Sequence, residues 1–316
     1  MRKAGIILLI AGALTLTGAI VAGVAIAMGA AEGLSGERTP HTYVIEDDFH
    51  NIDIDVSVSE VKLKCSDDAT CSVQTLDGEK IYHTVAVEDD ALKVRMVDNL
   101  NFVEKMFGYT RLSVTINLPG SAYNKLLMNS STGSFESEEA LNFNSANVET
   151  TTGLIKVSNL VTKDLKATCS TGGIVLDNVE CDSMNLVTST GGVIVKNSTI
   201  HGDIRSTGST GTRKFEGVRC VNATVEASTG SLEFKDFIAS GHLAATCSTG
   251  SVSLYNSDAE TLRIETTTGS VRGNLLTPKT FRVTKNTGSY HVPSTTGPLC
   301  EIVVSTGSVD IEVGTK

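Results

Sequence analysis

The sequence predicts an all-β protein, most of which is a parallel β-solenoid, and three observations support this fold class. Ten of the Thr-Gly pairs after residue 131 follow one another at a spacing of 19 or 20 residues from glycine to glycine. Apolar residues alternate with polar ones on both sides of each pair. The segment between two pairs is too short to contain a crossover helix as well as strands. A period held over that many units indicates one supersecondary element stacked on itself.

Each repeat unit is expected to contain two short strands. Two and four residues after the glycine most units are apolar, as at Ile174 and Leu176. Seven and five residues before the glycine the same holds, as at Leu165 and Ala167. Such alternation is typical of a strand with one buried face. Ten coils stacked at roughly 4.8 Å would form a rod about 48 Å long.

The corners of the coils are assigned to the residues that recur between the strands. Asn lies six residues after the glycine in several units, and Asn tolerates the left-handed backbone of tight corners. A twisted sandwich is the alternative fold, but its hairpin loops would not recur at one fixed interval. The predicted Thr-Gly corners are Gly133, Gly153, Gly172, Gly191, Gly211, Gly230, Gly250, Gly269, Gly288 and Gly307.

Two units depart from the pattern. Arg213 occupies the inward position two residues after Gly211, and Gly273 the inward position four residues after Gly269. Each is expected to mark a local bulge or a coil of different cross-section.

The N-terminal segment predicts a membrane anchor. Residues 4–31 carry no charge, and 6–28 are almost wholly apolar, which is long enough for a helix to span a bilayer. A cleaved signal peptide is the alternative, because small residues follow Ala25-Ile26-Ala27. With Arg2 and Lys3 in the cytoplasm, the bulk of this single-pass protein would lie outside the cell membrane.

We divide the chain into a cytoplasmic tip (1–3), the anchor or signal peptide (4–31), a linker (32–41), an N-terminal β cap region (42–122) and the solenoid (123–316). The cap region alternates without Thr-Gly pairs, as at Ile52, Ile54 and Val56. A solenoid exposes an unpaired strand edge at each end, which such a segment would cover. Residues 99–109 are expected to form a long hairpin loop, with a short amphipathic helix as the alternative.

The predicted last strand, Val309 to Val313, is followed directly by the end of the sequence. Asp310, Glu312 and Lys316 are the charges on this final edge. We therefore expect the C-terminal coil either to meet a partner, a second copy end to end included, or to rely on those charges against self-association.

The seven cysteines predict mainly buried thiols. Cys169, Cys247 and Cys300 fall in inward registers, where a thiol behaves as a small hydrophobe. Cys65 and Cys71 are the pair that could be bonded, because residues 61–73 resemble a hairpin whose facing positions come close enough for a disulfide.

Charge and motifs predict no catalytic, cofactor or metal site. The formal net charge is −10, which gives no electrostatic reason to bind nucleic acid. The histidines show no metal-ligand spacing, and no nucleophile elbow or phosphate loop is present. A solenoid carbohydrate-active enzyme is the least favoured reading, because glycoside hydrolysis needs two carboxylates on one cleft. The candidate acids alternate instead with Lys and Arg, as in a solvated face: Asp177, Glu226, Glu233 and Glu265.

An outward stripe four and two residues before the glycines is rich in Thr and Ser, as at Thr168 and Ser170. Such a hydroxyl ladder could bind glycan or ice, although Glu149, Val187 and Glu226 interrupt it. The simpler interpretation is that Thr favours β structure.

The chain resembles a bacterial family of β-strand-repeat proteins, catalogued as a domain of unknown function (DUF4097) and described as putative adhesins. The resemblance rests on the order of short segments: the VKLKCSDD run, Asp89-Asp90, RLSVTINLPG leading into SSTGSF, and the later STG repeats. It implies a cell-envelope β-solenoid without catalytic residues. We expect a membrane-anchored protein that presents its solenoid for adhesion or scaffolding and binds an envelope protein or a cell-surface glycan. The alternative is a regulatory partner in envelope stress that binds another membrane protein through the open C-terminal coil.

Overall fold

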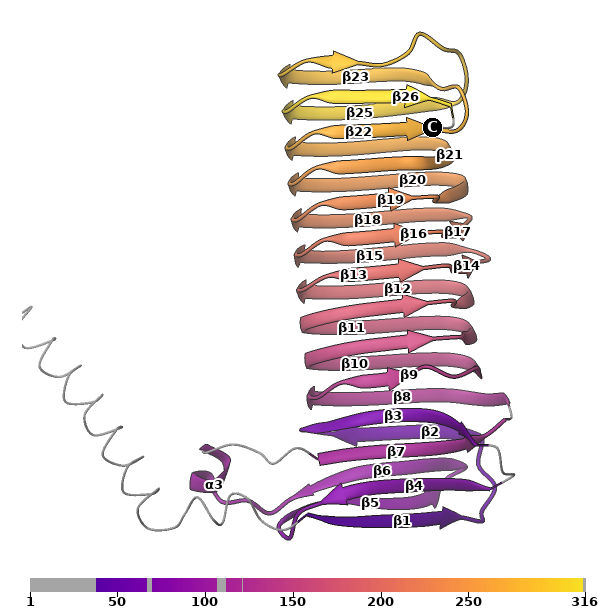
Figure 1. The fold of residues 1–316 in the computed structure, drawn as a ribbon, viewed down its shortest axis with the longest axis vertical. Helices are drawn as coiled ribbons and strands as arrows, with labels where there is room; N and C mark the ends of the chain where they lie inside the picture. Colours follow the sequence, from indigo (N-terminus) through magenta and orange to yellow (C-terminus); the bar gives the residue numbers. More distant parts are fainter. Residues whose placement is uncertain (1–37, 67–69, 107–111, 121, 315–316) are drawn as a thin grey trace, which may run out of the picture.

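The computed structural model describes residues 38–66, 70–106, 112–120 and 122–314, which form a straight stack of β coils (Figure 1). The strands of this part belong to one continuous 26-stranded sheet wound around a common core. The predicted all-β parallel solenoid is therefore confirmed. Within the described ranges no helix is long and apolar enough to cross a membrane, and the predicted anchor, residues 4–31, lies outside them.

Each coil contributes one strand to each of two long walls. Wall A holds the strands before the Thr-Gly corners and wall B the strands after them, and a short side closes the coil. Strands β10 (Leu141–Ser158) and β11 (Leu160–Asp177) bend through the corner and supply both walls. The other strands of the regular coils are β8 (Ala122–Thr132), β9 (Phe135–Ser137), β12 (Glu180–Thr190), β13 (Val193–Lys196), β14 (Thr199–Ile200), β15 (Asp203–Thr210), β16 (Arg213–Glu216), β17 (Arg219–Cys220), β18 (Asn222–Thr229), β19 (Leu232–Lys235), β20 (Ile238–Thr249), β21 (Val252–Thr268) and β22 (Val271–Leu275).

Neighbouring coils pair in parallel, so each side chain stacks on its equivalent in the next coil. Ile155, Ile174 and Val193 follow one another across wall B and are all buried. Burial of one such side chain stabilises the fold by roughly 1.5–3 kcal/mol. The inward alternation seen in the sequence thus builds the core.

The Thr-Gly corners stack as a continuous ladder. A Cβ atom built on Gly172 would overlap the carbonyl oxygen of Gly153, and one on Gly191 would overlap that of Gly172. The φ angles there are +137° and +146°, a region that favours glycine. The Asn corners stack too: Asn178 Nδ2 donates to Asn159 Oδ1 at 2.7 Å.

The N-terminal end departs from sequence order. Strands β2 (Asn51–Val56) and β3 (Ser59–Ser66) form a coil between β8–β9 and the later strands β6 (Ala91–Asp98) and β7 (Leu112–Pro119). Three antiparallel strands close the stack: β5 (Ile81–Glu88) on β6, and β4 (Cys71–Asp77) with β1 (Thr39–Ile45) on β7. Parallel stacking therefore extends below the first Thr-Gly corner.

The predicted hairpin over residues 61–73 is wrong. Strand β7 lies between β3 and β4, with Leu118 in register with Cys65 and Asn117 in register with Ser72. Cys65 and Cys71 are therefore two strand spacings apart, roughly 10 Å, and both are free thiols in the structure. The expected disulfide relied on direct pairing of these strands, and that pairing does not occur.

Residues 102–106 form a short helix, α3 (Phe102–Met106), so the expected hairpin loop is wrong here and the alternative holds. Asn101 Oδ1 accepts a hydrogen bond from the backbone N–H of Glu104, and Glu104 Oε2 accepts one from that of Asn101. This reciprocal pair is a capping box, which explains where the helix begins.

The C-terminal end also departs from sequence order. Strands β25 (Leu299–Thr306) and β26 (Val309–Val313) form a coil between β21–β22 and the earlier strands β23 (Thr280–Thr287) and β24 (Tyr290–His291). A Cβ atom on Gly288 would overlap the carbonyl oxygen of Gly307, and one on Gly307 that of Gly269, in agreement with this order. The expectation that the last strand forms the open edge is wrong, because β23 and β24 end the stack (Figure 1).

Two connecting segments, residues 277–280 and 292–298, cross between the C-terminal coils and are hydrogen-bonded to each other; we call this crossing the clasp. Residues 292–298 run from the end coil back to β25 and cross residues 277–280. Thr295 Oγ1 donates to the carbonyl oxygen of Lys279 at 2.7 Å, and Thr280 Oγ1 donates to that of Gly297 at 2.7 Å. The Lys279 side chain is buried beneath this crossing and lies 2.8 Å from Asp258 Oδ1.

The two irregular units have different outcomes. At Gly273 the register between β21 and β22 shifts, so the predicted bulge is confirmed there. Arg213 keeps the register of Val193 and Leu232. Its fully buried side chain fits because Gly208 has no side chain; a Cβ atom at Gly208 would overlap the guanidinium group of Arg213. Arg213 Nη2 donates to Thr188 Oγ1 at 2.7 Å and Nη1 to the carbonyl oxygen of Gly211 at 2.9 Å.

Candidate functional site

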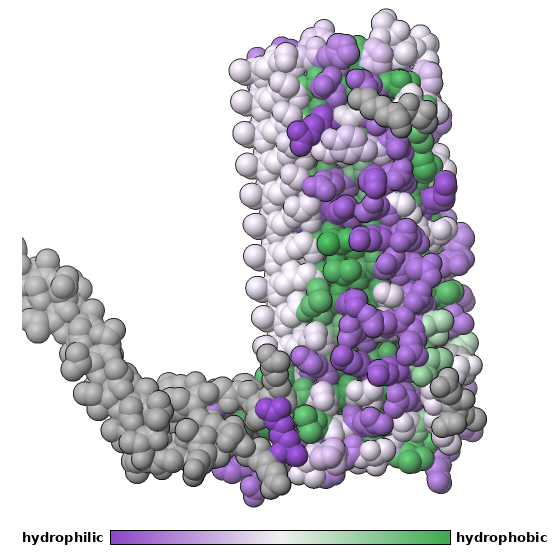
Figure 2. Space-filling view, in the orientation of Figure 1, coloured by the Kyte–Doolittle hydropathy of each residue, from purple (hydrophilic) through white to green (hydrophobic). Residues whose placement is uncertain are grey.

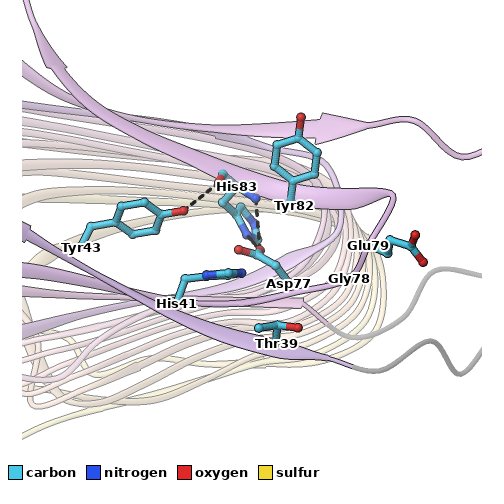
Figure 3. A pocket seen from close by; sticks show the side chains of 8 residues that line it. All are labelled: Thr39, His41, Tyr43, Asp77, Gly78, Glu79, Tyr82 and His83. Atoms are coloured by element: carbon cyan, nitrogen blue, oxygen red, sulfur yellow. Dashed lines mark hydrogen bonds and ion pairs between the residues drawn. The ribbon is translucent and has the colours of Figure 1, made fainter.

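The N-terminal end of the rod is hollowed between the edge strands β1 and β5 (Figure 3). A cavity of about 520 Å³ lies there, with Thr39, His41 and Tyr43 on one lip and Tyr82 and His83 on the other. Tyr43 Oη donates to the carbonyl oxygen of His83 at 3.5 Å and so joins the lips. Burial, and then the charge of Asp77, raises the pKa of Tyr43.

A buried chain of polar groups forms the floor of this cavity. His83 Nδ1 lies 2.6 Å from Asp77 Oδ1, and His83 Nε2 lies 2.7 Å from Ser59 Oγ. Thr75 Oγ1 donates to the other Asp77 oxygen at 2.5 Å. Burial lowers the pKa of His83, and the hydrogen bond to Asp77 opposes that shift.

The order Ser–His–Asp is that of a catalytic triad, but the environment of Ser59 does not suit acyl transfer. A nucleophilic serine must reach a substrate carbonyl beside oxyanion donors. Ser59 is fully buried, and its carbonyl oxygen packs against Gly133 in the next coil. These buried hydrogen bonds therefore join strands β3, β4 and β5 and stabilise the N-terminal end of the rod.

A second groove of about 380 Å³ crosses the short side of the regular coils nearest the N-terminal end of the rod. Its floor includes Tyr123 and Phe143, whose rings lie tilted against each other with centres 5.7 Å apart and are almost fully buried. Its rim includes His201, whose Nε2 lies 2.9 Å from Glu180 Oε1. The aromatic rings serve the core more than they offer a ligand platform.

The third feature is a ridge along the Thr-Gly corners, here called the corner ridge: the two residues before and the one after each corner glycine. The threonine before each of the ten corner glycines is exposed, from Thr132 to Thr306. No position of the ridge carries a charged side chain, although the chain has a net charge of −10. Figure 2 shows it as an evenly spaced pale column along one edge of the rod.

The walls beside the ridge pair their charges internally. On wall B, Glu216 lies between Lys214 and Lys235, at 3.3 Å and 2.7 Å. On wall A, Arg263 lies 3.2 Å from Glu301. The corner ridge is thus a long, uncharged and hydroxyl-rich strip between two faces whose charges are partly neutralised.

The sequence-predicted site residues are distributed accordingly. The ten corner glycines come together in one ladder beneath the ridge. The candidate acids divide between the walls, Glu226 and Glu265 on wall A and Asp177 and Glu233 on wall B, so they do not face one cleft. The described ranges hold no cluster of three or more His, Cys, Asp or Glu side chains suited to a metal ion.

The Ser59–His83–Asp77 chain was not found from the sequence. Its members lie on three strands with no shared motif, and the swapped order of the N-terminal coils brings them together. His83 alone offered a signal, because it falls at an inward position of an apolar strand.

Comparisons with known proteins identify the fold. The model of a family described as Toastrack DUF4097 matches residues 49–209. A putative adhesin from Parabacteroides merdae has a similar structure, with a TM-score of 0.52 at 15% identity, over 77% of this chain and 97% of that one. A putative lipid binding protein from Parabacteroides distasonis gives a TM-score of 0.47 at 19% identity, over 76% of this chain and 97% of that one. No curated protein matches.

Proposed function

The chain belongs to the Toastrack DUF4097 family. We propose that it is a non-enzymatic, envelope-anchored adhesin whose corner ridge binds a glycan polymer side-on. The observation that carries the proposal is the run of ten exposed threonines on one uncharged strip. A structural relative described as a putative adhesin shares the fold.

The chemistry of the ridge suits a neutral, repeating ligand. Each coil presents two or three small side chains, mostly hydroxyls that both donate and accept hydrogen bonds. Stacking repeats this pattern at the strand spacing of roughly 4.8 Å. A polymer that engages several coils gains from multivalency even when each contact is weak. A charged polymer would gain little from a strip without charges.

We further propose that residues 4–31 anchor the rod in the cell membrane, with residues 1–3 in the cytoplasm and the rest outside. The support is the uncharged apolar run behind Arg2 and Lys3. Protease added to intact cells should then degrade the rod. Deletion of residues 4–31 should release the protein from the membrane fraction.

The ridge is tested by adding bulk and charge to three adjacent corners. The variant Thr190→Lys, Thr210→Lys, Thr229→Lys changes stacked positions of the ridge. A matched control, Val161→Lys, Thr199→Lys, Val221→Lys, adds the same charge to exposed positions on the short side. We expect the ridge variant of the full-length protein to lose at least tenfold in binding to isolated cell-wall polysaccharide, while the control binds normally. Equal binding by both variants would contradict the proposal.

A further inference from the structure

We propose that the far end of the rod, the outer edge of β23, is a docking edge for an extended acidic strand of a partner protein. This proposal is independent of the corner ridge and concerns a different surface. It rests on an open strand edge, on a local reversal of charge and on two cationic side chains with defined positions.

The outer edge of β23 is open. Within the described part of the chain, β23 pairs only with β25, and β24 only with β26. Alternate backbone N–H and C=O groups of β23 therefore point away from the rod. Such a row is a template for an added strand, whose main-chain hydrogen bonds supply affinity.

The charge of this end is opposite to that of the whole chain. Residues 276–299 contain Lys279, Arg282 and Lys285 but no Asp or Glu, whereas the protein carries −10. Lys279 is buried beside Asp258, so Arg282 and Lys285 define the charge of the edge. An anionic partner is favoured there by attraction at short range.

Arg282 ends a ladder of alternating charge. Across three neighbouring strands of wall A, Arg263 lies 3.2 Å from Glu301, and Glu301 lies 3.6 Å from Arg282. The Arg282 side chain is 67% exposed. An added partner strand that continued this alternation would place a carboxylate opposite Arg282.

Lys285 decides which strands the edge accepts. It is in register with the buried Val304, so it occupies a position that faces the core, beside the half-buried Phe281 and Val283. Its Nζ lies 5.8 Å from the ring centre of Tyr290. An apolar strand would cover Lys285 without a counter-charge, and such a cost discriminates against it. A strand with a carboxylate at that position satisfies it.

A second copy of β23 is a poor occupant. Two such strands would bring Arg282 and Lys285 of one copy next to the same residues of the other, and like charges across a strand pair are destabilising. The fitting partner instead has acidic residues three positions apart, opposite Arg282 and Lys285, and apolar residues opposite Phe281 and Val283.

A peptide derived from this chain provides the probe. Strand β25 already presents Glu301 to Arg282, so its sequence, Leu299 to Thr306, is used with Cys300→Val and Val304→Glu. The reference peptide carries lysine at both acidic positions. We expect the acidic peptide to bind the full-length protein in detergent at least tenfold more tightly, as measured by fluorescence anisotropy.

Charge reversal on the protein tests the assignment of residues. The variant Arg282→Glu, Lys285→Glu should lose the acidic peptide and gain the lysine peptide. A matched control, Lys166→Glu, Arg205→Glu, makes the same charge change on exposed positions in the middle of wall A and should bind as the wild type. Equal loss in both variants, or equal binding of both peptides, would overturn the proposal.

Strand pairing is separated from simple charge attraction by backbone methylation. Two acidic peptides, N-methylated at alternate residues, block opposite edges of the added strand. We expect only one of them to lose binding. Loss in neither, or competition by inorganic polyphosphate as strong as that by the peptide, would show a site for anions only. A dimer of the wild type that Lys285→Glu abolishes would show that the occupant is a second copy.

Discussion

At the Thr-Gly corners, a hydrogen atom in place of a side chain lets each coil lie directly on the carbonyl group of the coil below. The same period brings the corner threonines to the surface, so the residue that permits stacking is adjacent to the residue proposed to bind ligand. Structure and proposed function thus share one motif of two residues.

A pair of adjacent glycines tests the steric argument. Gly191 has a φ of +146° and no room for a Cβ atom, whereas a Cβ atom on Gly192 would lie 3.5 Å from its nearest neighbour, an ordinary contact. We expect Gly191→Ala to destabilise the rod by at least about 2–3 kcal/mol and Gly192→Ala by less than about 1 kcal/mol. Thermal unfolding of both variants checks this, and equal shifts would contradict it.

The buried His83 predicts a dependence of stability on pH. Folding lowers the pKa of His83 below the value of 6.5 expected for a free imidazole, because burial disfavours the charged ring. The unfolded chain therefore binds the proton more readily, and the contribution of His83 is complete above pH 6.5 and is lost as the pH falls from there. Thermal midpoints from pH 7.5 to pH 5 should fall less steeply in His83→Gln than in the wild type. Parallel curves would contradict this assignment.

At the scale of the strand, the two ends of the rod use one device. In each case a coil is inserted between two other coils that follow one another in the sequence. The chain therefore enters the end coil and then turns back towards the rod. Connecting segments on both sides of the end coil hold it in place.

Deletion of strands β25 and β26, the last coil in the sequence, tests the order of the C-terminal coils. Strands β23 and β24 pair with β25 and β26, so removal of residues 299–316 should also release residues 280–291. We expect hydrogen exchange of 280–287 to rise to the rate of an unfolded segment. A stack in sequence order would leave that segment protected.

The end strand is protected by its inward lysine. Lys285 occupies a position that is apolar in β25, and an inward charge on an edge strand hinders association with other edges. We expect Lys285→Val to form end-to-end oligomers in sedimentation velocity, whereas Lys166→Val, which removes the same charge in mid-wall, remains like the wild type. Identical profiles would show that the clasp protects the end by itself.

The local sequence pattern predicted where the strands lie better than which strands pair with each other. The alternation at Leu165, Ala167, Ile174 and Leu176 predicts which side of a strand is buried, and all four side chains are buried in the structure. It contains no information about which coil stacks on which, so both exchanges and the position of β7 between Cys65 and Cys71 were missed. The capping box of α3 was present in the sequence, but five residues of helix do not produce a periodic signal.

At the scale of the molecule, the rod separates its surfaces by chemistry. The walls pair their charges, the corner ridge is neutral, and the far end is cationic on an acidic chain. Burial raises the pKa of Cys181, Cys220 and Cys300 to about 12, so these thiols stay protonated and act as core residues. The two surfaces proposed to bind partners are the corner ridge and the cationic end.

The most direct test of the central claim is photo-crosslinking in living cells from a probe placed on one coil. The full-length protein would carry a photoreactive side chain either at Thr229 on the corner ridge or at Thr199 on the short side, both exposed. We predict that the probe at Thr229 captures cell-surface glycan and that the probe at Thr199 does not. Capture from Thr199 alone, or from neither position while the purified rod still binds polysaccharide, would contradict a ligand held along the ridge.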